Sequence, residues 1–306
     1  GKNSYGQLGL NDNENRKQFT KVPLLPVPAL ASAPVSVLVL NYPIASDLLI
    51  RTNELQSKQL AYYITSIINK EESKTVSINN IKYLSKGTFG EGFKIAFTDD
   101  TFAFCKIPTG QTGATTMLKN EFDILTKLNH PNIIDEKYFI DMTTDSLKYI
   151  LKDSNTAKTI DVTGYTKTNT VIMITELYKN TIDKLEKEHW KDPINLIKFL
   201  MNMSHALYYI NSKSFVHKDI KPNNILYIEN SNEGISDKYY KIIDFGVSQK
   251  LAQSLGDMKY QRVEGFSGTP RYGSSDAYSV NTDKTDIYAL GVSVLELLFG
   301  SLNKRQ

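Results

Sequence analysis

The chain has 306 residues, of which 41% are hydrophobic and 23% are charged, so it can bury the core of one large domain or of two domains. Its net charge of +3 is too small to indicate binding to nucleic acid or to a membrane surface. Cys105 is the single cysteine, which excludes an intrachain disulfide, and no apolar run approaches the roughly 18–20 residues of a membrane-spanning helix.

Residues 1–23 contain a glycine-rich motif followed by a short extended stretch. The motif resembles one repeat of the regulator-of-chromosome-condensation propeller family, written G-x-N-x-x-G-Q-L-G, and its matching residues are Gly1, Asn3, Gly6, Gln7, Leu8 and Gly9. One partial repeat cannot bury its own face, and no second convincing copy follows. Exchange-factor or chromatin activity is therefore not inferred, and a glycine-rich tail or the remnant of an upstream domain is the favoured interpretation.

Residues 24–74 are predicted to be a linker or a docking segment. A helix within residues 49–70 would place Leu60, Tyr63, Ile64 and Ile67 on one face. The charged stretch Glu71–Lys74 marks the expected domain boundary. The chain starts with Gly rather than Met and stops just after an apolar helix, so we expect a fragment. The lack of a secretory signal pattern and of disulfides favours a cytoplasmic, intracellular location.

Three short strands are predicted between Ile78 and Ile107, with glycines in the first turn at Gly87 and Gly90. Glycine lets backbone N–H groups approach phosphate oxygens closely, although most glycine hairpins are merely turns. Lys106 ends the third strand, where an exposed lysine is the ordinary alternative. Glu121 follows in a predicted helix whose apolar face is Leu118, Phe122, Leu125 and Leu128, and Pro131 is expected to stop that helix.

Residues 141–170 are polar and irregular, and they are predicted to form a solvated insertion between two strands. Val171–Thr175 then forms an apolar strand that leads to Glu176 and Tyr178. A helix over Pro193–Ser212 follows, and its core stripe is formed by Leu196, Leu200, Met203, Leu207 and Ile210.

That helix leads to the sequence Val-His-Lys-Asp-Ile-Lys-Pro-Asn-Asn-Ile-Leu at residues 216–226. Asp219 can accept a hydroxyl proton, Lys221 can hold a phosphate oxygen, and Asn224 can turn a carbonyl oxygen toward a metal ion. A polar turn built on Pro222 and two asparagines is the alternative. Asp244-Phe245-Gly246 follows another short apolar strand.

These segments, taken in order, resemble the eukaryotic protein kinases over about residues 77–306. The catalytic loop of that family is written H-R-D-x-x-x-x-N, and here Lys218 replaces its Arg. The resemblance implies a two-lobed α+β fold, with a small β-rich lobe and a large helical lobe over residues 75–306. The helix predicted over Asp286–Phe299 is apolar nearly all round, so we expect it to be buried. Because the family has further helices after this one, the domain is expected to be incomplete at its C-terminus.

The resemblance also assigns roles to individual residues. Catalysis would involve Asp219 and Lys221, together with a Lys106–Glu121 ion pair that fixes the lysine against the phosphates of ATP. Mg²⁺ would be held by Asn224 and Asp244. The expected nucleotide-binding residues are Gly87, Gly90, Lys106, Glu176, Tyr178 and Leu226. Thr269 in Gly268–Tyr272 would hydrogen-bond Asp219 and Lys221.

Several positions depart from the family pattern. Ser85 replaces the first glycine of the loop, and Gly92 and Phe104 replace a Val and an Ala that cover the adenine ring. We hypothesise that the phenyl ring compensates for the missing Val; the alternative is that it blocks adenine. Ser274-Ser275-Asp276 stands where the family has A-P-E, which is similar to the casein-kinase-like branch and leaves the anchoring of the segment open.

The predicted function is therefore a serine/threonine protein kinase that transfers the γ-phosphate of ATP to hydroxyls of a protein substrate, since Lys221 is typical of that class. The alternative is a pseudokinase that scaffolds partners with little or no transfer. A third interpretation is a propeller-type exchange factor with a kinase appended. The sequence indicates no nucleic-acid or membrane partner and leaves the oligomeric state unknown.

Overall fold

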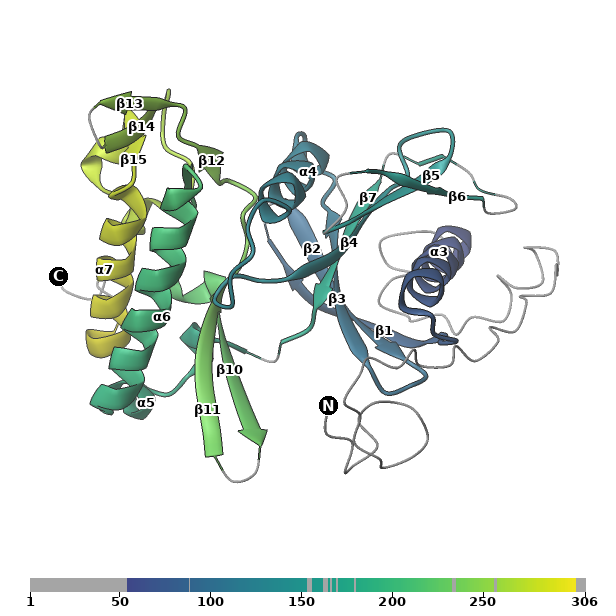
Figure 1. Cartoon of the computed structure of the whole chain (residues 1–306), viewed down its shortest axis with the longest axis horizontal. Coiled ribbons are helices and arrows are strands. Elements are labelled where there is room, and N and C mark those ends of the chain that lie inside the picture. Colours follow the sequence, from purple (N-terminus) through teal and green to yellow (C-terminus); the bar gives the residue numbers. More distant parts are fainter. Residues whose placement is uncertain are drawn as a thin grey trace, which may run out of the picture.

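The computed structural model describes one chain as two lobes, one rich in strands and one rich in helices (Figure 1). The residues that it describes are 54–87, 89–152, 156–161, 165, 167–168, 170–178, 180–232, 235–255 and 258–300. The repeat-like segment 1–23, and the part of the predicted linker before residue 54, lie outside these residues. The two-lobed α+β architecture expected from the sequence is confirmed.

The small lobe is built on a seven-stranded antiparallel sheet with the order β1-β2-β3-β7-β4-β5-β6. Its strands are β1 Ile78–Lys86, β2 Gly90–Phe97, β3 Phe102–Pro108, β4 Glu136–Asp141, β5 Leu147–Leu151, β6 Lys158–Ile160 and β7 Val171–Glu176. The three strands predicted between Ile78 and Ile107 are thus present as β1, β2 and β3. The strand β7 matches the predicted apolar strand and lies in the middle of the sheet, where all of Val171–Thr175 is buried.

Helices cover both faces of this sheet. On one face lies α4, Ala114–Leu125, which packs through the predicted Leu118, Phe122 and Leu125. It ends at Leu125, six residues before Pro131, so the prediction that Pro131 stops it was wrong. The chain turns earlier because Leu128 and Ile133 are drawn into the core beyond the helix.

The opposite face is covered by α3, Glu54–Glu72 (Figure 1). The predicted apolar residues Leu60, Tyr63, Ile64 and Ile67 are all buried there, in a cluster with residues of β1 to β5 and β7. The helix therefore docks on the sheet that follows it, across the boundary predicted at Glu71–Lys74.

The prediction that residues 141–170 form a solvated loop was wrong. They contain β5 and β6, which extend the sheet at its β4 edge. Leu147 and Tyr149 are buried at 1% and 0% exposure, while Lys148 between them is partly exposed. Alternation of apolar and polar residues is typical of a strand with one buried face, and the many polar residues of the segment concealed it.

Two carboxylates near the end of α3 bind this added hairpin and its neighbour β4. Glu71 accepts hydrogen bonds from Tyr149 Oη at 2.6 Å and Lys158 Nζ at 2.8 Å, and Glu72 accepts one from Tyr138 Oη at 2.8 Å. Burial alone would raise the pKa of Glu71. The hydrogen bonds from Lys158 and Tyr149 outweigh burial and hold the pKa below its ordinary value of 4.5.

The free energy of unfolding should therefore decrease as the pH is lowered. A carboxylate whose pKa is lowered by folding stabilises the native state above its unfolded pKa, and this contribution is lost as pH drops below about 4.5 toward the folded pKa. We expect Glu71→Gln to be less stable than the parent at pH 7, and the difference to shrink toward pH 3. Urea unfolding at both pH values measures this, with the exposed Glu188→Gln as control; an unchanged difference would contradict the assignment.

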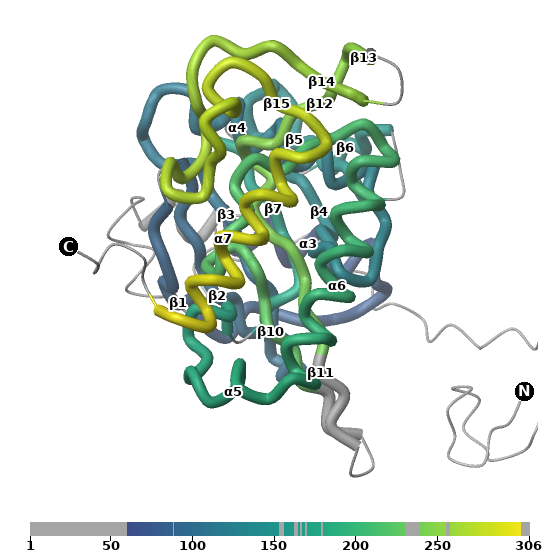
Figure 2. The backbone as a smooth tube through the Cα atoms, turned by 90° about the vertical axis from the view of Figure 1, so that its left-hand side faces the viewer, coloured from purple at the N-terminus to yellow at the C-terminus, as the bar shows by residue number. Residues whose placement is uncertain are grey.

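The large lobe is organised around α6 and α7, which run beside each other (Figure 2). Its helices are α5 Lys187–Lys191, α6 Pro193–Ser212 and α7 Thr285–Phe299, with short 3-10 turns η1 Ile182–Lys184, η2 Pro222–Asn224, η3 Pro270–Tyr272 and η4 Ser275–Tyr278. Its strands are β8 Asn180–Thr181, β9 Phe215–Val216, β10 Ile225–Asn232, β11 Ile235–Ile242, β12 Gln249–Lys250, β13 Gln253–Leu255, β14 Met258–Arg262 and β15 Val280–Thr282.

The helix α6 begins as predicted. Pro193 occupies its first turn, and the side chain of Asp192 caps it by accepting a hydrogen bond from the Ile194 N–H at 2.9 Å. Of the predicted core stripe, Met203, Leu207 and Ile210 are buried, whereas Leu196 and Leu200 are partly buried.

The prediction that the apolar helix over Asp286–Phe299 is buried holds for one face only. Ala289, Leu290 and Leu297 of α7 are buried, but Tyr288 and Phe299 are 51% and 67% exposed. Within the described part of the chain α7 packs chiefly against α5, α6 and η3, which cover one side of it. A search of the same residues for a helix long and apolar enough to cross a membrane found none.

Candidate active site

The loop that carries Asp219, which the resemblance to kinases predicts to be catalytic, lies between β9 and η2 and is held in place by α7. Asp286, in the first turn of α7 and fully buried, accepts hydrogen bonds from the backbone N–H of His217 at 2.7 Å and of Lys218 at 2.8 Å. Burial raises the pKa of Asp286, and interactions with His217 and Lys218 oppose that rise. Lys218 has a φ of 72°, and these two bonds stabilise the loop in that left-handed conformation.

The imidazole of His217 connects this loop to the strand before Asp244. Its Nδ1 accepts a hydrogen bond from the Asp219 N–H at 3.2 Å, so the opposite nitrogen, Nε2, is the donor to the Ile243 carbonyl at 3.0 Å. The ring is fully buried and meets Phe245 edge to face at 4.6 Å. No site role was predicted for His217, and its partner Ile243 is 26 residues away along the chain.

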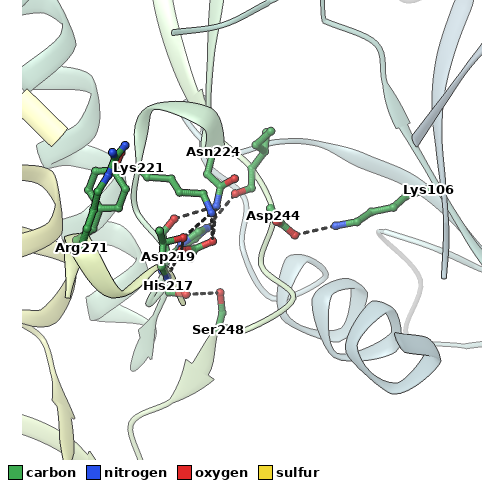
Figure 3. Close-up of polar contacts among 11 residues, drawn as sticks. Lys106, His217, Asp219, Lys221, Asn224, Asp244, Ser248 and Arg271 are labelled. Carbon is green, nitrogen blue, oxygen red and sulfur yellow. Dashed lines mark hydrogen bonds and ion pairs between the residues drawn. The ribbon is translucent and has the colours of Figure 1, made fainter. Parts of the chain in front are cut away.

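Both carboxylate oxygens of Asp219 accept hydrogen bonds, from its own loop and from the segment that carries Thr269 (Figure 3). Oδ2 accepts hydrogen bonds from Lys221 Nζ at 2.7 Å and Asn224 Nδ2 at 2.9 Å. Oδ1 accepts from the Thr269 N–H at 2.8 Å and from Thr269 Oγ1 at 2.7 Å. Lys221 also donates to Thr269 Oγ1 at 2.7 Å, so the expected contacts of Thr269 are present.

A second group of charged residues is formed by Lys106 and Glu121 of the small lobe and Asp244 from the segment after β11. Lys106 Nζ lies 2.7 Å from Glu121 Oε2 on α4 and 2.7 Å from Asp244 Oδ1. The predicted Lys106–Glu121 pair thus forms and also reaches Asp244, which has a left-handed φ of 66°. Glu121 uses its other oxygen to accept the Phe245 N–H at 3.2 Å, which ties α4 to the segment after Asp244.

Lys106, Glu121 and Asp244 shift one another's pKa values because their charges lie close together. Lys106 lowers the pKa of Asp244, because the cation stabilises the carboxylate against the cost of burial. Burial would lower the pKa of Lys106, but the two carboxylates outweigh it and raise that pKa. The carboxylate of Glu121 is more deeply buried, and burial raises its pKa despite Lys106.

The glycine loop leaves room for this lysine. A Cβ at Gly90 would lie 2.7 Å from Lys106 Cε, closer than Cβ atoms approach other atoms in proteins. The loop closes through a hydrogen bond from the Gly87 N–H to the Gly90 carbonyl at 2.8 Å. A Cβ at position 90 would therefore push the end of the Lys106 side chain away from its present position beside Glu121 and Asp244.

Comparison with known proteins agrees with this geometry. The model of the family described as protein kinase domain matches residues 78–305. The chain belongs to the protein kinase family. Similar proteins include one from Acanthamoeba polyphaga mimivirus named as a serine/threonine-protein kinase (R517/R518), which is 30% identical over 254 residues, covering 76% of this chain and 50% of that protein.

Two further relatives are more distant. The cysteine-rich receptor-like protein kinase 25 of Arabidopsis thaliana is 26% identical over 246 residues, covering 76% of this chain and 31% of the relative. The interferon-induced, double-stranded RNA-activated protein kinase of Rattus norvegicus is 29% identical over 227 residues, covering 72% and 40% respectively. This chain therefore spans half or less of the length of these relatives.

The remaining predicted nucleotide-binding residues lie where β7 leaves the small lobe of this kinase domain. Glu176 ends β7, and the Tyr178 hydroxyl donates to its carboxylate. Burial, followed by that hydrogen bond, raises the pKa of Tyr178, and Lys241 Nζ lies 5.3 Å from the centre of its ring. Leu226 on β10 pairs with Thr181 of β8 and is buried.

The segment that carries Thr269 has an anchor that the sequence did not reveal. Glu296 on α7 accepts a hydrogen bond from Arg271 Nη2 at 2.6 Å and another from the Tyr272 hydroxyl. Burial, together with the contact to Glu296, raises the pKa of Tyr272 to about 12. Ser275 and Asp276, at the position of the family's A-P-E, form η4, and the side chain of Asp276 is exposed. Glu296 thus anchors the segment that carries Thr269, which the sequence had left open.

We expect Glu296→Gln to loosen this segment and to lower stability by about 1–2 kcal/mol. One charged hydrogen bond is lost from the buried Tyr272, and the Arg271 pair is half exposed and contributes less. Limited proteolysis after Arg262 or Arg271 should become faster, and thermal unfolding gives the stability change. Glu264→Gln, in an exposed position of the same segment, is the control; equal proteolysis of both variants would contradict the role of Glu296.

The residues present fit a magnesium ion bound together with phosphate. Both Nδ2 bonds of Asn224 go to Asp219, to its carbonyl and its carboxylate at 2.9 Å, so its side-chain oxygen is left for another ligand. In the described part of the chain no group of three or more His, Cys, Asp or Glu could hold a metal by itself. Mg²⁺ is commonly held by one or two protein ligands plus substrate phosphates, which matches a pair formed by Asn224 and Asp244.

Proposed function

We propose that this kinase domain transfers the γ-phosphoryl group of ATP to serine or threonine hydroxyls of a protein substrate. The observation that carries the proposal is the joined set Asp219, Lys221 and Thr269, with mutual contacts of 2.7–2.8 Å. Phosphoryl transfer depends mainly on positioning and on charge neutralisation. A rigid carboxylate next to a lysine supplies both.

Each side chain has a distinct role in this proposal. Asp219 orients the acceptor hydroxyl and accepts its proton, and Lys221 neutralises charge on the phosphoryl oxygens. Lys106, held by Glu121, positions the α- and β-phosphates, and the glycine loop with Gly87 and Gly90 covers them. Asn224 and Asp244 would hold Mg²⁺, which when bound neutralises charge on the β- and γ-phosphates.

The choice of serine and threonine rests on Lys221 and its bond to Thr269. A lysine two residues after the catalytic aspartate is typical of that class, and the similarity of several relatives named as serine/threonine kinases supports it. The lack of an A-P-E triplet favours a casein-kinase-like branch. Glu176, Tyr178 and Leu226 are proposed to bind the nucleotide.

A protein substrate is supported by a hollow of about 230 Å³ next to the catalytic loop. Its lining includes Pro222 and Asn223 from the loop, Tyr272 from the Thr269 segment, and the charged residues Asp183, Lys187 and Glu296. A substrate protein whose hydroxyl lies at Asp219 can place its neighbouring residues against this surface. A cytoplasmic location is proposed from the single, buried Cys105. The repeat-like motif at residues 1–9 supports no activity of its own.

A second candidate is a pseudokinase that binds partners without transfer. Phe104, Gly92 and Ser85 favour it, since they change the part of the site expected to cover the nucleotide. The contacts of Lys106 with Glu121 and Asp244, and those of Asp219 with Lys221 and Asn224, favour the enzyme.

Radiolabelled phosphate transfer from Mg²⁺-ATP to a generic protein substrate separates the two functions. The parent chain should label serine and threonine, detected by phosphoamino-acid analysis, and the Asp219→Asn form is the negative control. Label on tyrosine alone would overturn the serine/threonine assignment. A folded parent that transfers nothing would favour the pseudokinase.

A further inference from the structure

An unusual pair of residues lies on the sheet beside Lys106. A Cβ added to Gly92 on β2 would lie 2.7 Å from both Cε2 and Cζ of Phe104 on β3, and 2.9 Å from Ser85 Oγ on β1. These separations are shorter than real Cβ contacts. The phenyl ring of Phe104 thus occupies the space in which any side chain at position 92 would lie.

The ring lies on the face of the sheet that carries the site. Ala103 and Cys105 belong to the cluster under α3, so Phe104 and Lys106, which alternate with them, point to the opposite face. Phe104 pairs with Thr175 across β3 and β7, next to the point where the chain passes between the lobes. Two residues along a strand span roughly 7 Å, so Phe104 lies about that far from Lys106 toward this connection.

We propose that Phe104 is the wall on which the base of the nucleotide stacks, and that Gly92 is required because it leaves room for the ring. This inference rests on the proposed function, because it takes the phosphates to lie at Lys106. A base joined to those phosphates then extends toward Thr175 and meets the flat face of the ring. Aromatic rings stack well on nucleobases, and the contact is tolerant of base identity.

The test measures binding of ATP and of inorganic tripolyphosphate, which lacks a base, to the full chain. Phe104→Ala should weaken ATP binding about tenfold to a hundredfold, in line with the loss of one base-stacking contact. It should leave tripolyphosphate binding unchanged. Phe102→Ala is the matched control, because Phe102 lies on the same strand, is 49% exposed and contacts Lys94.

A reciprocal pair of variants tests the role of Gly92. Gly92→Val should weaken ATP binding at least tenfold because it displaces the ring, and adding Phe104→Ala to it should cause little further loss, because the stacking contact is already gone. Gly92→Ala replaces Gly92→Val if the latter does not fold, as judged by circular dichroism. Tighter ATP binding by Phe104→Ala would overturn the proposal and show that the ring obstructs the base. Unchanged ATP binding by the Gly92 variants would also overturn it. So would an equal weakening of ATP binding and tripolyphosphate binding by Phe104→Ala.

These outcomes are independent of phosphate transfer. A chain that binds ATP through Phe104 but transfers no phosphate would retain this inference and lose the proposed enzyme function. A chain that transfers phosphate but binds ATP more tightly without the ring would retain the proposed enzyme function and lose this inference.

Discussion

Replacing Asp219 by Asn is expected to reduce phosphate transfer by about 10²–10⁴-fold, the usual contribution of a proton-accepting group. The carboxylate accepts four hydrogen bonds, from Lys221, Asn224 and the N–H and Oγ1 of Thr269. An amide has one acceptor oxygen, and its NH₂ group would face donors on one side. The variant should also hold Thr269 less tightly, because two of the three hydrogen bonds between Thr269 and the loop are made to the Asp219 carboxylate.

Initial rates of transfer measure the effect, with thermal unfolding to establish that the variant is folded. Asp145→Asn is the control, since the Asp145 side chain is 94% exposed and lies in the small lobe. A folded Asp219→Asn variant with transfer near that of the parent would remove Asp219 from the chemistry.

The Asp286→Ala variant is expected to lose about 2–6 kcal/mol of stability. The substitution leaves the buried N–H groups of His217 and Lys218 without an acceptor, and each unsatisfied group costs about 1–3 kcal/mol. Native domains are stable by only about 5–15 kcal/mol, so a large fraction would be lost. Asp286→Asn keeps one acceptor oxygen and should lose less.

Urea unfolding of Asp286→Ala and Asp286→Asn measures the loss of stability in each variant. Asp276→Ala, at an exposed position of η4, is the control and should lie within about 0.5 kcal/mol of the parent. If Asp286→Ala unfolds at the same urea concentration as the parent, the two hydrogen bonds do not stabilise the loop as described.

The sequence was sufficient where chemistry is carried by short local segments. Asp219, Lys221 and Asn224 lie within six residues, Lys106 lies in β3 and Asp244 follows β11, and their order and spacing matched the kinase pattern. The structure brings these residues together with Glu121 as the resemblance to kinases implied. Their roles in catalysis remain predictions.

What the sequence did not show depends on contacts between distant segments. Asp286 lies 69 residues from its partner His217, and Glu296 lies 24 residues from Tyr272. A signal existed for Asp286, because a carboxylate within an apolar helix must find hydrogen-bond donors when it is buried. The β5–β6 hairpin was missed for a different reason, since its short strands lie among the many polar residues of the segment 141–170.

The two helices that cover the small-lobe sheet belong to different hydrophobic clusters. The residues beneath α3, including Ala103 and Cys105, form one apolar cluster within the small lobe, whereas α4 shares a second cluster with residues of the large lobe, including Ile220 and α6. The strands β4 and β7 contribute residues to both clusters, so the sheet itself is held from both faces. Lys106 stands on this sheet, and Glu121 stands on the helix whose cluster continues into the large lobe. A local displacement of α4 from the sheet would therefore break this ion pair with a smaller free-energy change than unfolding of the domain requires.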